Sequence, residues 1–448
     1  ATLTANPDFS FSPLDERKIN TTRFDLFFPE TRDFFLQDAS AFEFGGVPFS
    51  NNDGGDSNGM PFFSRNIGLV RGEHVPILAG AKISGEAIGW NVGAFSTLTD
   101  ELGAQNRQVL SAVRLAHPVL DESKAGFIFT NGDPTGNSNN SVIGGDFQYR
   151  NTHIGAGNTL NIHGAYLRSI SSTHGEDDEY TFAVQYPNEP WFGRLVYRQI
   201  GSDFRPALGF VNRTGIRDYI TNFGHMSRVT DPFFQWWQIG TFNRATTDIN
   251  NRLQSWVGAF YAGAQNNSGD QLFFNLQREY EAVDGDFGVG GRAVVTAGTY
   301  RWNYFDLNIN TSQKRSWYLF SDVTCCDFYG GTALQLFLQI GYRPNETLEF
   351  IPGYVAAYID LPTGSVDIHV PTLKVNVNFS PDMSIKSEAQ YDNLSHSLGF
   401  STRYRWEYSP GAELFIAVGE NALVEHRLAH YASQTSQASV RIGHTFRY

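Results

Sequence analysis

The side chains of this chain that could do chemistry are charged residues in two kinds of surroundings. One group lies in a stretch rich in phenylalanine near the N-terminus, and the other occupies the polar positions of alternating segments near the C-terminus. A charge held away from water needs a partner of opposite sign, so these residues suit ion pairing and the binding of polar groups. They are Glu30, Arg32, Asp38 and Arg65 in the first group and Lys386, Glu388, Arg403, Arg405 and Glu407 in the second.

No catalytic residue is assigned from the sequence. Ser169 and Ser171 are potential nucleophiles and His163 or His174 are potential bases, but nothing in the sequence brings a nucleophile and a base together. A hydrolase that uses histidine and acidic residues of its loops is therefore the least supported hypothesis. We expect that the chain is not an enzyme.

Calcium is the one metal that the composition suggests, and the suggestion is weak. Asp53 and Asp56, with Asn58, supply oxygen ligands of the kind that Ca²⁺ binds. Their spacing differs from that of the helix-loop-helix calcium motif, and no glutamate follows where that motif needs one. A solvated Gly/Asn-rich loop is the favoured alternative, so no cofactor is predicted.

The cysteines and the net charge exclude other classes of site. Cys325 and Cys326 are adjacent, which excludes both a zinc site of the usual spacing and a disulfide framework. We expect two thiols on opposite faces of a strand, with a vicinal disulfide as the alternative. A formal net charge of −13 and the absence of a basic cluster argue against nucleic-acid binding.

A period of two in apolar and polar residues predicts the elements that position the charged side chains. Residues 398–408 carry Leu, Phe, Thr, Tyr, Trp and Tyr at alternate positions, with Gly, Ser, Arg, Arg and Glu between them. Residues 334–341 and 373–380 show the same period, and residues 440–448 repeat it up to an aromatic end. This period is that of a β-strand, and we predict no helix.

Strand length and composition favour a membrane barrel over a soluble sandwich. Several runs extend for nine residues or more, close to the about 9–11 residues of a tilted strand that crosses a bilayer. Aromatic residues make up 15% of the chain and charged residues 18%. One face of each strand would meet lipid and the other water. The predicted fold class is all-β, a transmembrane antiparallel outer-membrane β-barrel of about 22–26 strands.

Turn residues divide the chain into strands and connections. Arg343-Pro344-Asn345 and Ser409-Pro410-Gly411 predict tight turns, whereas residues 131–140 and 171–179 predict longer loops. Alternating short and long connections are typical of outer-membrane barrels. The predicted domains are residues 1–60, N-terminal strands with a plug or loop segment, and residues 61–448, the barrel itself.

The first sixty residues differ from the rest of the chain. Phenylalanine is frequent over residues 24–44, and a Gly/Asn/Asp-rich stretch follows at 51–59. A barrel of more than about 20 strands encloses a wide lumen, which is commonly plugged. We predict that part of residues 29–60 folds into the lumen or across one mouth, with Glu30 and Arg32 paired with charges of the lumen. A surface loop held by hydrophobic contacts is the alternative.

Several motifs resemble those of an uncharacterised family of Gram-negative outer-membrane barrel proteins. Phe28-Pro29-Glu30-Thr31-Arg32-Asp33-Phe34-Phe35-Leu36 resembles the family's Phe-Pro-Glu-Lys-Arg-Pro-Phe-Phe-Leu, from which Thr31 and Asp33 depart. Residues 63–68 are similar to its Tyr-Ser-Arg-Arg-Ile-Gly, and residues 389–393 and 403–415 are similar to its closing blocks. Members usually carry an N-terminal domain like family 9 carbohydrate-binding modules, which this sequence does not include.

The resemblance implies a place in the outer membrane of a Gram-negative bacterium but no settled activity. The expected partners are outer-membrane lipid and lipopolysaccharide, the barrel-assembly machinery through the C-terminal strand, and a carbohydrate-binding or other protein. The leading hypothesis is a porin-like channel or transport pathway for oligosaccharides or another solute. The alternative is a plugged, non-conducting barrel that anchors a periplasmic or surface protein module.

Overall fold

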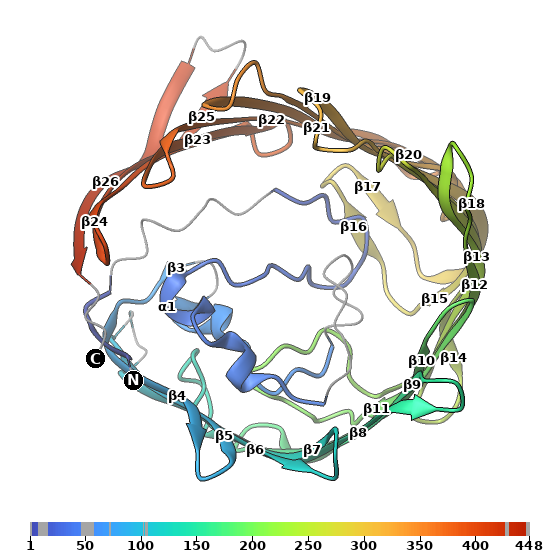
Figure 1. Cartoon of the computed structure of the whole chain (residues 1–448), viewed down its shortest axis with the longest axis horizontal. Helices are drawn as coiled ribbons and strands as arrows, with labels where there is room; N and C mark the ends of the chain where they lie inside the picture. The colour runs from blue at the N-terminus through green and yellow to red at the C-terminus, as the bar shows by residue number, and fades with distance from the viewer. Residues whose placement is uncertain are drawn as a thin grey trace. The chain divides into compact units, whose positions relative to one another are not determined.

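The chain is mostly β. The structure, a computed structural model, describes residues 2–7, 17–45, 58–70, 73–101, 103, 106–425 and 430–444. In this part of the chain 22 strands form one antiparallel sheet, and two short strand pairs stand apart from it (Figure 1). The predicted fold class, all-β and antiparallel with about 22–26 strands, is confirmed.

Two compact units divide the described residues. The first draws on Ala1–Asp8, Phe24–His225 and Thr241–Val257, and the second on Phe9–Arg23, Met226–Gly240 and Gly258–Tyr448. Three strands contribute residues to both units: β12 (Ile216–Arg228), β13 (Phe234–Asp248) and β14 (Leu253–Asn266).

The first unit begins with short helices. These are α1 (Asp33–Leu36), η1 (Ala39–Phe42) and η2 (Ser64–Asn66), so the prediction of no helix is wrong at these places. The further strands of this unit are β1 (Thr2–Ala5), β2 (Leu69–Val70), β3 (Glu73–His74), β4 (Ile77–Ala87), β5 (Trp90–Thr99), β6 (Gln108–Val119), β7 (Ser123–Asn131), β8 (Asn140–Ile154), β9 (Asn158–Ser171), β10 (Gly175–Pro187) and β11 (Trp191–Ile200). From β4 to β12 each strand pairs with the next, and β1 pairs with β4.

The second unit is a second run of antiparallel neighbours. Its strands are β15 (Gln271–Val283), β16 (Phe287–Val289), β17 (Ala293–Val295), β18 (Gly298–Asn310), β19 (Trp317–Phe328), β20 (Gly331–Tyr342), β21 (Leu348–Leu361), β22 (Gly364–Ser380), β23 (Met383–Asp392), β24 (Ser397–Ser409), β25 (Ala412–Glu425) and β26 (His430–His444). Each strand of the sheet pairs with the next, and the β16–β17 hairpin packs beside β21 and β22.

Side chains alternate between two faces of the sheet in each unit. In β10, Phe182 is 51% exposed, whereas the adjacent Ala183 is fully buried. We call the face with the exposed rings and aliphatic chains the outer face and the opposite one the inner face. The outer face carries Phe127, Ile143, Phe147, Tyr166, Phe182, Leu195 and Phe223 in the first unit and Leu272, Leu276, Leu338, Leu373, Phe400, Trp406, Ile416, Val418, Val440 and Ile442 in the second.

The connections confirm some predicted turns and correct others. Residues 343–347 and 410–411 are short connections, as expected, and residues 132–139 are a longer one. The predicted loop at 171–179 is wrong, because β10 already begins at Gly175 and pairs with β9. No helix among the described residues is long and apolar enough to cross a membrane.

The expectation of two separate thiols is also wrong. Cys325 and Cys326 form a disulfide within β19. That expectation rested on strict alternation of neighbouring side chains, which this pair of residues does not follow.

Candidate functional site

The N-terminal segment, residues 24–45 and 58–70, packs on the inner face of the first unit (Figure 1). Phe44 is buried in a core with apolar side chains of β7, β8 and β9. The ring of Phe35 in α1 lies 5.7 Å from that of Phe95 in β5. Large rings remove much apolar surface from water, which explains why this stretch is rich in phenylalanine.

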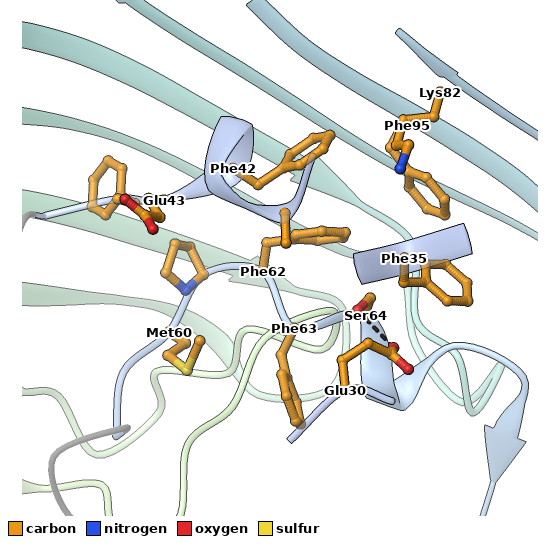
Figure 2. Close-up of a pocket in the computed structure, with 13 residues that line it drawn as sticks. Glu30, Phe35, Phe42, Glu43, Met60, Phe62, Phe63, Ser64, Lys82 and Phe95 are labelled. Carbon is orange, nitrogen blue, oxygen red and sulfur yellow. Dashed lines mark hydrogen bonds between the residues drawn. The ribbon is translucent and has the colours of Figure 1, made fainter. Parts of the chain in front are cut away.

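An ion pair and several hydrogen bonds link two parts of this segment, and we call this set of contacts the Glu30–Arg32 cluster. Arg32 Nη2 lies 2.7 Å from Glu30 Oε2, and Arg32 Nε donates to Glu30 Oε1 at 2.8 Å. The other guanidinium donors reach the carbonyl oxygens of Ile67 at 2.6 Å and Ser64 at 2.7 Å. The Ser64 hydroxyl donates to Glu30 Oε2 at 2.7 Å (Figure 2). The Glu30–Arg32 cluster therefore connects residues 30–32 to residues 64–67.

The environment of Glu30 favours its ionised form. Burial alone raises the pKa of this carboxyl, because the charge loses water. The hydrogen bonds and positive charge of Arg32, with the Ser64 hydroxyl, outweigh burial and hold the pKa of Glu30 below its ordinary value of 4.5. The carboxylate is thus ionised at neutral pH, as the ion pair requires.

Three cationic side chains of the inner face donate to backbone carbonyls of the N-terminal segment. They come from β4, β6 and β11, so the contacts are spread along the first unit. The contacts are Lys82 Nζ to the oxygens of Phe34 at 2.8 Å and of Gln37, Arg114 Nε to that of Glu43 at 2.9 Å, and Arg198 Nη1 to that of Asn58 at 2.7 Å. Hydrogen bonds to charged donors are stronger than neutral ones, so these three residues fix the path of the segment.

Arg114 also forms a buried ion pair. Its Nη1 lies 2.7 Å from Asp146 Oδ1 and its Nη2 lies 2.9 Å from Oδ2, and both side chains are at most 2% exposed. Asp146 Oδ2 accepts the backbone N–H of Gly45 at 3.1 Å. A side chain at Gly126 would overlap the Arg114 guanidinium, so the glycine leaves the room that the arginine needs. This pair clamps the segment from both sides of Phe44.

Asn58 and Gly59 form another point of attachment. Asn58 Nδ2 donates to the carbonyl of Arg213 at 2.8 Å, and its Oδ1 accepts the N–H of Asn212 at 2.9 Å. Gly59 has a φ of +87°, and a Cβ there would overlap the carboxylate of Glu179. Glycine is needed at this position for its conformation and for the close approach.

A cavity of about 540 Å³ lies between the N-terminal segment and the strands β4 and β5 (Figure 2). Its size is that of a small-molecule site, for which about 300–1,000 Å³ is usual. The wall is largely aromatic, with a few polar groups. The rings are those of Phe35, Phe42, Phe44, Phe62, Phe63 and Phe95, and the polar groups are Glu30, Glu43, Ser64 and Lys82. Apolar walls with a few polar groups are typical of ligand sites.

The polar residues predicted near the C-terminus lie on the inner face of the second unit. Several of them form ion pairs within a strand or between neighbouring strands. Lys374 Nζ lies 3.8 Å from Glu388 Oε1, Arg405 Nη2 lies 3.1 Å from Glu407 and 3.2 Å from Glu413, and Arg441 lies 3.8 Å from Glu413. Lys386 faces Arg403 across the ladder of β23 and β24. The sheet thus places these residues opposite the exposed rings of Phe400 and Trp406.

The structure places the remaining predicted residues as follows. Asp38 is half exposed, 3.8 Å from Lys82, and Arg65 Nη1 donates to the Thr31 hydroxyl at 3.2 Å. Asp53 and Asp56 lie outside the described residues. Among the residues that are described, no group of three or more His, Cys, Asp or Glu could hold a metal ion.

The sequence singled out Glu30 and Arg32 and predicted that they pair with charges of the lumen, whereas in the structure they pair with each other. It missed Lys82, Arg114 and Arg198, which hold the segment. The signal available for Arg114 is a lone charge in a row of small and apolar residues of one strand face, which otherwise holds Leu110, Ala112 and Ala116. Such a charge must find a buried partner.

Comparison with known proteins identifies one family match. The family described as a domain of unknown function, DUF5916, matches residues 1–117. These residues include the Glu30–Arg32 cluster, α1, and two of the three cationic side chains that hold the segment, Lys82 and Arg114. Among curated proteins, no sequence matches the chain.

Several solved structures are similar to this chain at very low identity. The siderophore receptor PirA from Acinetobacter baumannii is 9% identical with a TM-score of 0.48, over 86% of this chain and 83% of that chain. The ferric-catecholate import receptor Fiu from E. coli K12 is 7% identical with a TM-score of 0.44, over 84% and 73%. The ferric yersiniabactin uptake receptor FyuA from Yersinia pestis is 9% identical with a TM-score of 0.39, over 82% and 70%. At these values neither a ligand nor an activity carries over to this chain.

Proposed function

We propose that the chain is an outer-membrane β-barrel that provides a transport pathway for a solute, and that the N-terminal segment plugs this pathway. The two-faced sheet carries the proposal. Its outer face exposes rings and aliphatic chains in long rows, whereas its inner face bears ion pairs or the N-terminal segment. A protein surrounded by water rarely exposes apolar patches of this extent. Strands with one face toward lipid and the other toward water expose such patches, because lipid covers them.

The positions of two highly exposed tryptophans, Trp191 and Trp317, support the same proposal. Trp191 begins β11 beside the short connection 188–190, and it lies 4.6 Å from His225. Trp317 begins β19 and stacks on Tyr342 at 4.0 Å, again beside short connections. Both tryptophans are more than half exposed. Tryptophan and tyrosine are enriched where a membrane meets water, so we assign each of these strand ends to a membrane interface.

This assignment sets the proposed surroundings of the chain. Lipid and lipopolysaccharide of a Gram-negative outer membrane would cover the outer face. The barrel-assembly machinery would recognise the C-terminal strand, and a carbohydrate-binding or other protein module is a candidate partner. No step of the proposal requires a chemical reaction at the inner face.

A plugged, non-conducting barrel that anchors another protein is the second candidate. The observation in its favour is the number of strong attachments of the N-terminal segment, which include the buried pair of Arg114 and Asp146. A segment held in this way leaves only when several charged hydrogen bonds break together. The two candidates differ in whether the segment ever opens a water path.

Ion conductance in a planar bilayer tests the proposal. The intact chain is compared with a variant in which residues 33–58 are replaced by a short Gly/Ser linker. We expect low conductance from the intact chain and large, steady conductance from the variant, because the linker carries none of the rings and carbonyls that hold the segment. A variant with Glu346→Gln, an exposed residue of a short connection in the second unit, serves as the control for purification and insertion.

The outcomes separate the candidates. Conductance after replacement supports a plugged pathway, and conductance of the intact chain that rises with a particular solute supports transport. Absence of conductance in both proteins, with insertion verified, would contradict a pathway closed by this segment and would favour the anchoring role.

A further inference from the structure

We propose that the aromatic cavity beneath the N-terminal segment binds an organic cation with an apolar body, such as a hydrophobic amine in its protonated form. The inference names the ligand class of a site within the proposed pathway and in that sense rests on the proposed function. Binding at the cavity can nevertheless be measured without transport. The juxtaposition that carries the inference is the Glu43 carboxylate, which has no ion partner among the described residues, in a wall built mainly of phenyl rings.

The charges around the cavity are balanced except at Glu43. Arg32 is paired with Glu30 at 2.7 Å. Lys82 directs its ammonium to the carbonyl oxygens of Phe34 and Gln37, and Asp38 lies 3.8 Å away. Within the described part of the chain, the Glu43 carboxylate has neither a hydrogen bond nor an ion pair. Two cations and three anions leave a net charge of −1, which a ligand of charge +1 would neutralise.

The backbone of Glu43 is held in position next to the cavity. The carbonyl of Glu43 accepts from Arg114 Nε at 2.9 Å, and its N–H donates to the carbonyl of Ser40 at 3.2 Å. Figure 2 shows the Glu43 side chain among the residues that line the cavity. The side chain itself is exposed. Because the backbone that carries it is fixed before the ligand arrives, part of the ordering cost of binding is already met.

The rings supply the second half of the recognition. Phe42 and Phe62 lie 5.1 Å apart, and Phe62 lies 5.8 Å from Phe95. The face of an aromatic ring is negative, and it attracts a cation within about 6 Å of its centroid. The same rings exclude water from an apolar body. An anion would be repelled by the ring faces and by Glu43, and the Lys82 ammonium of the wall already donates to the carbonyl oxygens of Phe34 and Gln37.

Ligand-observed NMR on the full-length protein in detergent tests the inference. The probes are benzyltrimethylammonium and its neutral carbon isostere, neopentylbenzene, which has the same shape without the charge. We expect the cation to bind the native protein more tightly than the isostere. In Glu43→Gln, affinity for the cation should fall about tenfold, equivalent to about 1.4 kcal/mol, while the isostere binds unchanged.

Two further variants keep the test decisive. Glu346→Gln carries the same substitution at an exposed position of the second unit and should leave both affinities unchanged. Phe62→Leu keeps an apolar wall but removes a ring face, so it should weaken the cation more than the isostere. Unchanged isostere binding also shows that a variant still folds. Equal cation binding in the native protein and Glu43→Gln, or tighter binding of the isostere, would overturn the inference. Neither result depends on conductance, so failure here is distinct from failure of the proposed pathway.

Discussion

At the scale of single residues, a few buried cationic side chains hold the N-terminal segment on the inner face of the first unit. Arg114 forms an ion pair with Asp146, donates to the carbonyl oxygen of Glu43 and fills the space next to Gly126. A residue with so many partners cannot be exchanged for a neutral one without leaving several groups unpaired. Arg107, by contrast, is exposed and pairs with Asp100 in a connection.

We therefore predict that Arg114→Met loosens the N-terminal segment strongly, whereas Arg107→Met does not. The first change leaves Asp146 buried without its cation, which costs about 3–5 kcal/mol. The second removes an exposed pair of the kind that is typically worth about 0–1 kcal/mol. The rate of proteolytic cleavage within residues 24–70 measures the difference. The double variant Arg114→Met/Asp146→Leu should recover much of the protection, because neither charge is then left alone. Equal cleavage rates in the two arginine variants would contradict this account.

At the scale of elements, the N-terminal segment consists of short helices and irregular stretches. The Glu30–Arg32 cluster and three cationic side chains of the inner face hold them in place. Glu30 gives this docking a dependence on pH. Its pKa is depressed in the folded protein, so its ionisation contributes stability at a pH above 4.5. This contribution is lost as the pH falls through the depressed value.

We predict that hydrogen exchange of residues 24–45 and 58–70 rises as the pH falls below 4.5, once the intrinsic pH dependence of exchange is removed. Glu30→Gln is the matched control, because it cannot ionise and should show raised exchange without this component of the pH dependence. Strands β8 and β9 supply the internal reference. A native segment that stays as protected as these strands at pH 3 would exclude Glu30 as the group responsible.

Elements with a regular period were the predictable part of the fold. The period of two located β24 and the strands around it, because each residue there faces either apolar or polar surroundings. The turn-forming residues of 171–179 predict a loop. In the structure Arg168 of β9 neutralises Glu176 at 2.5 Å and Asp178 at 3.3 Å, and the strand forms. Such compensation across strands is absent from local sequence.

The site was less predictable than the strands for the same reason. Glu30 and Arg32 are two residues apart, and their motif stands out in the sequence. Lys82 and Arg198 act on carbonyl groups 45 or more residues away along the chain. A backbone acceptor has no signature in sequence, since every residue carries one. The cavity is likewise assembled from separate stretches, so the Glu43 carboxylate, which has no partner among the described residues, is recognised only from the fold.

At the scale of the whole molecule, the two faces of the sheet differ in polarity. The outer face exposes apolar side chains, and the inner face carries charged side chains. Neighbouring residues of β20 separate these two environments cleanly. Leu338 lies in the outer row and is 37% exposed, and Gln339 points to the opposite face of the same strand. An arginine at either position has the same size, charge and strand propensity, so the pair isolates the effect of the face.

We predict that Leu338→Arg impairs folding into phospholipid vesicles and that Gln339→Arg does not. A charge on the lipid face near the middle of a bilayer costs about 2–4 kcal/mol, whereas an inner-face charge meets water and polar side chains. The free energy of unfolding in urea, measured with the protein in vesicles, gives the comparison directly. In a sheet surrounded by water on its outer face, Leu338→Arg would instead be neutral, because its charge would be solvated. Equal stability of the two variants would therefore argue against a membrane on the outer face, and the predicted asymmetry would identify that face as the one in contact with lipid.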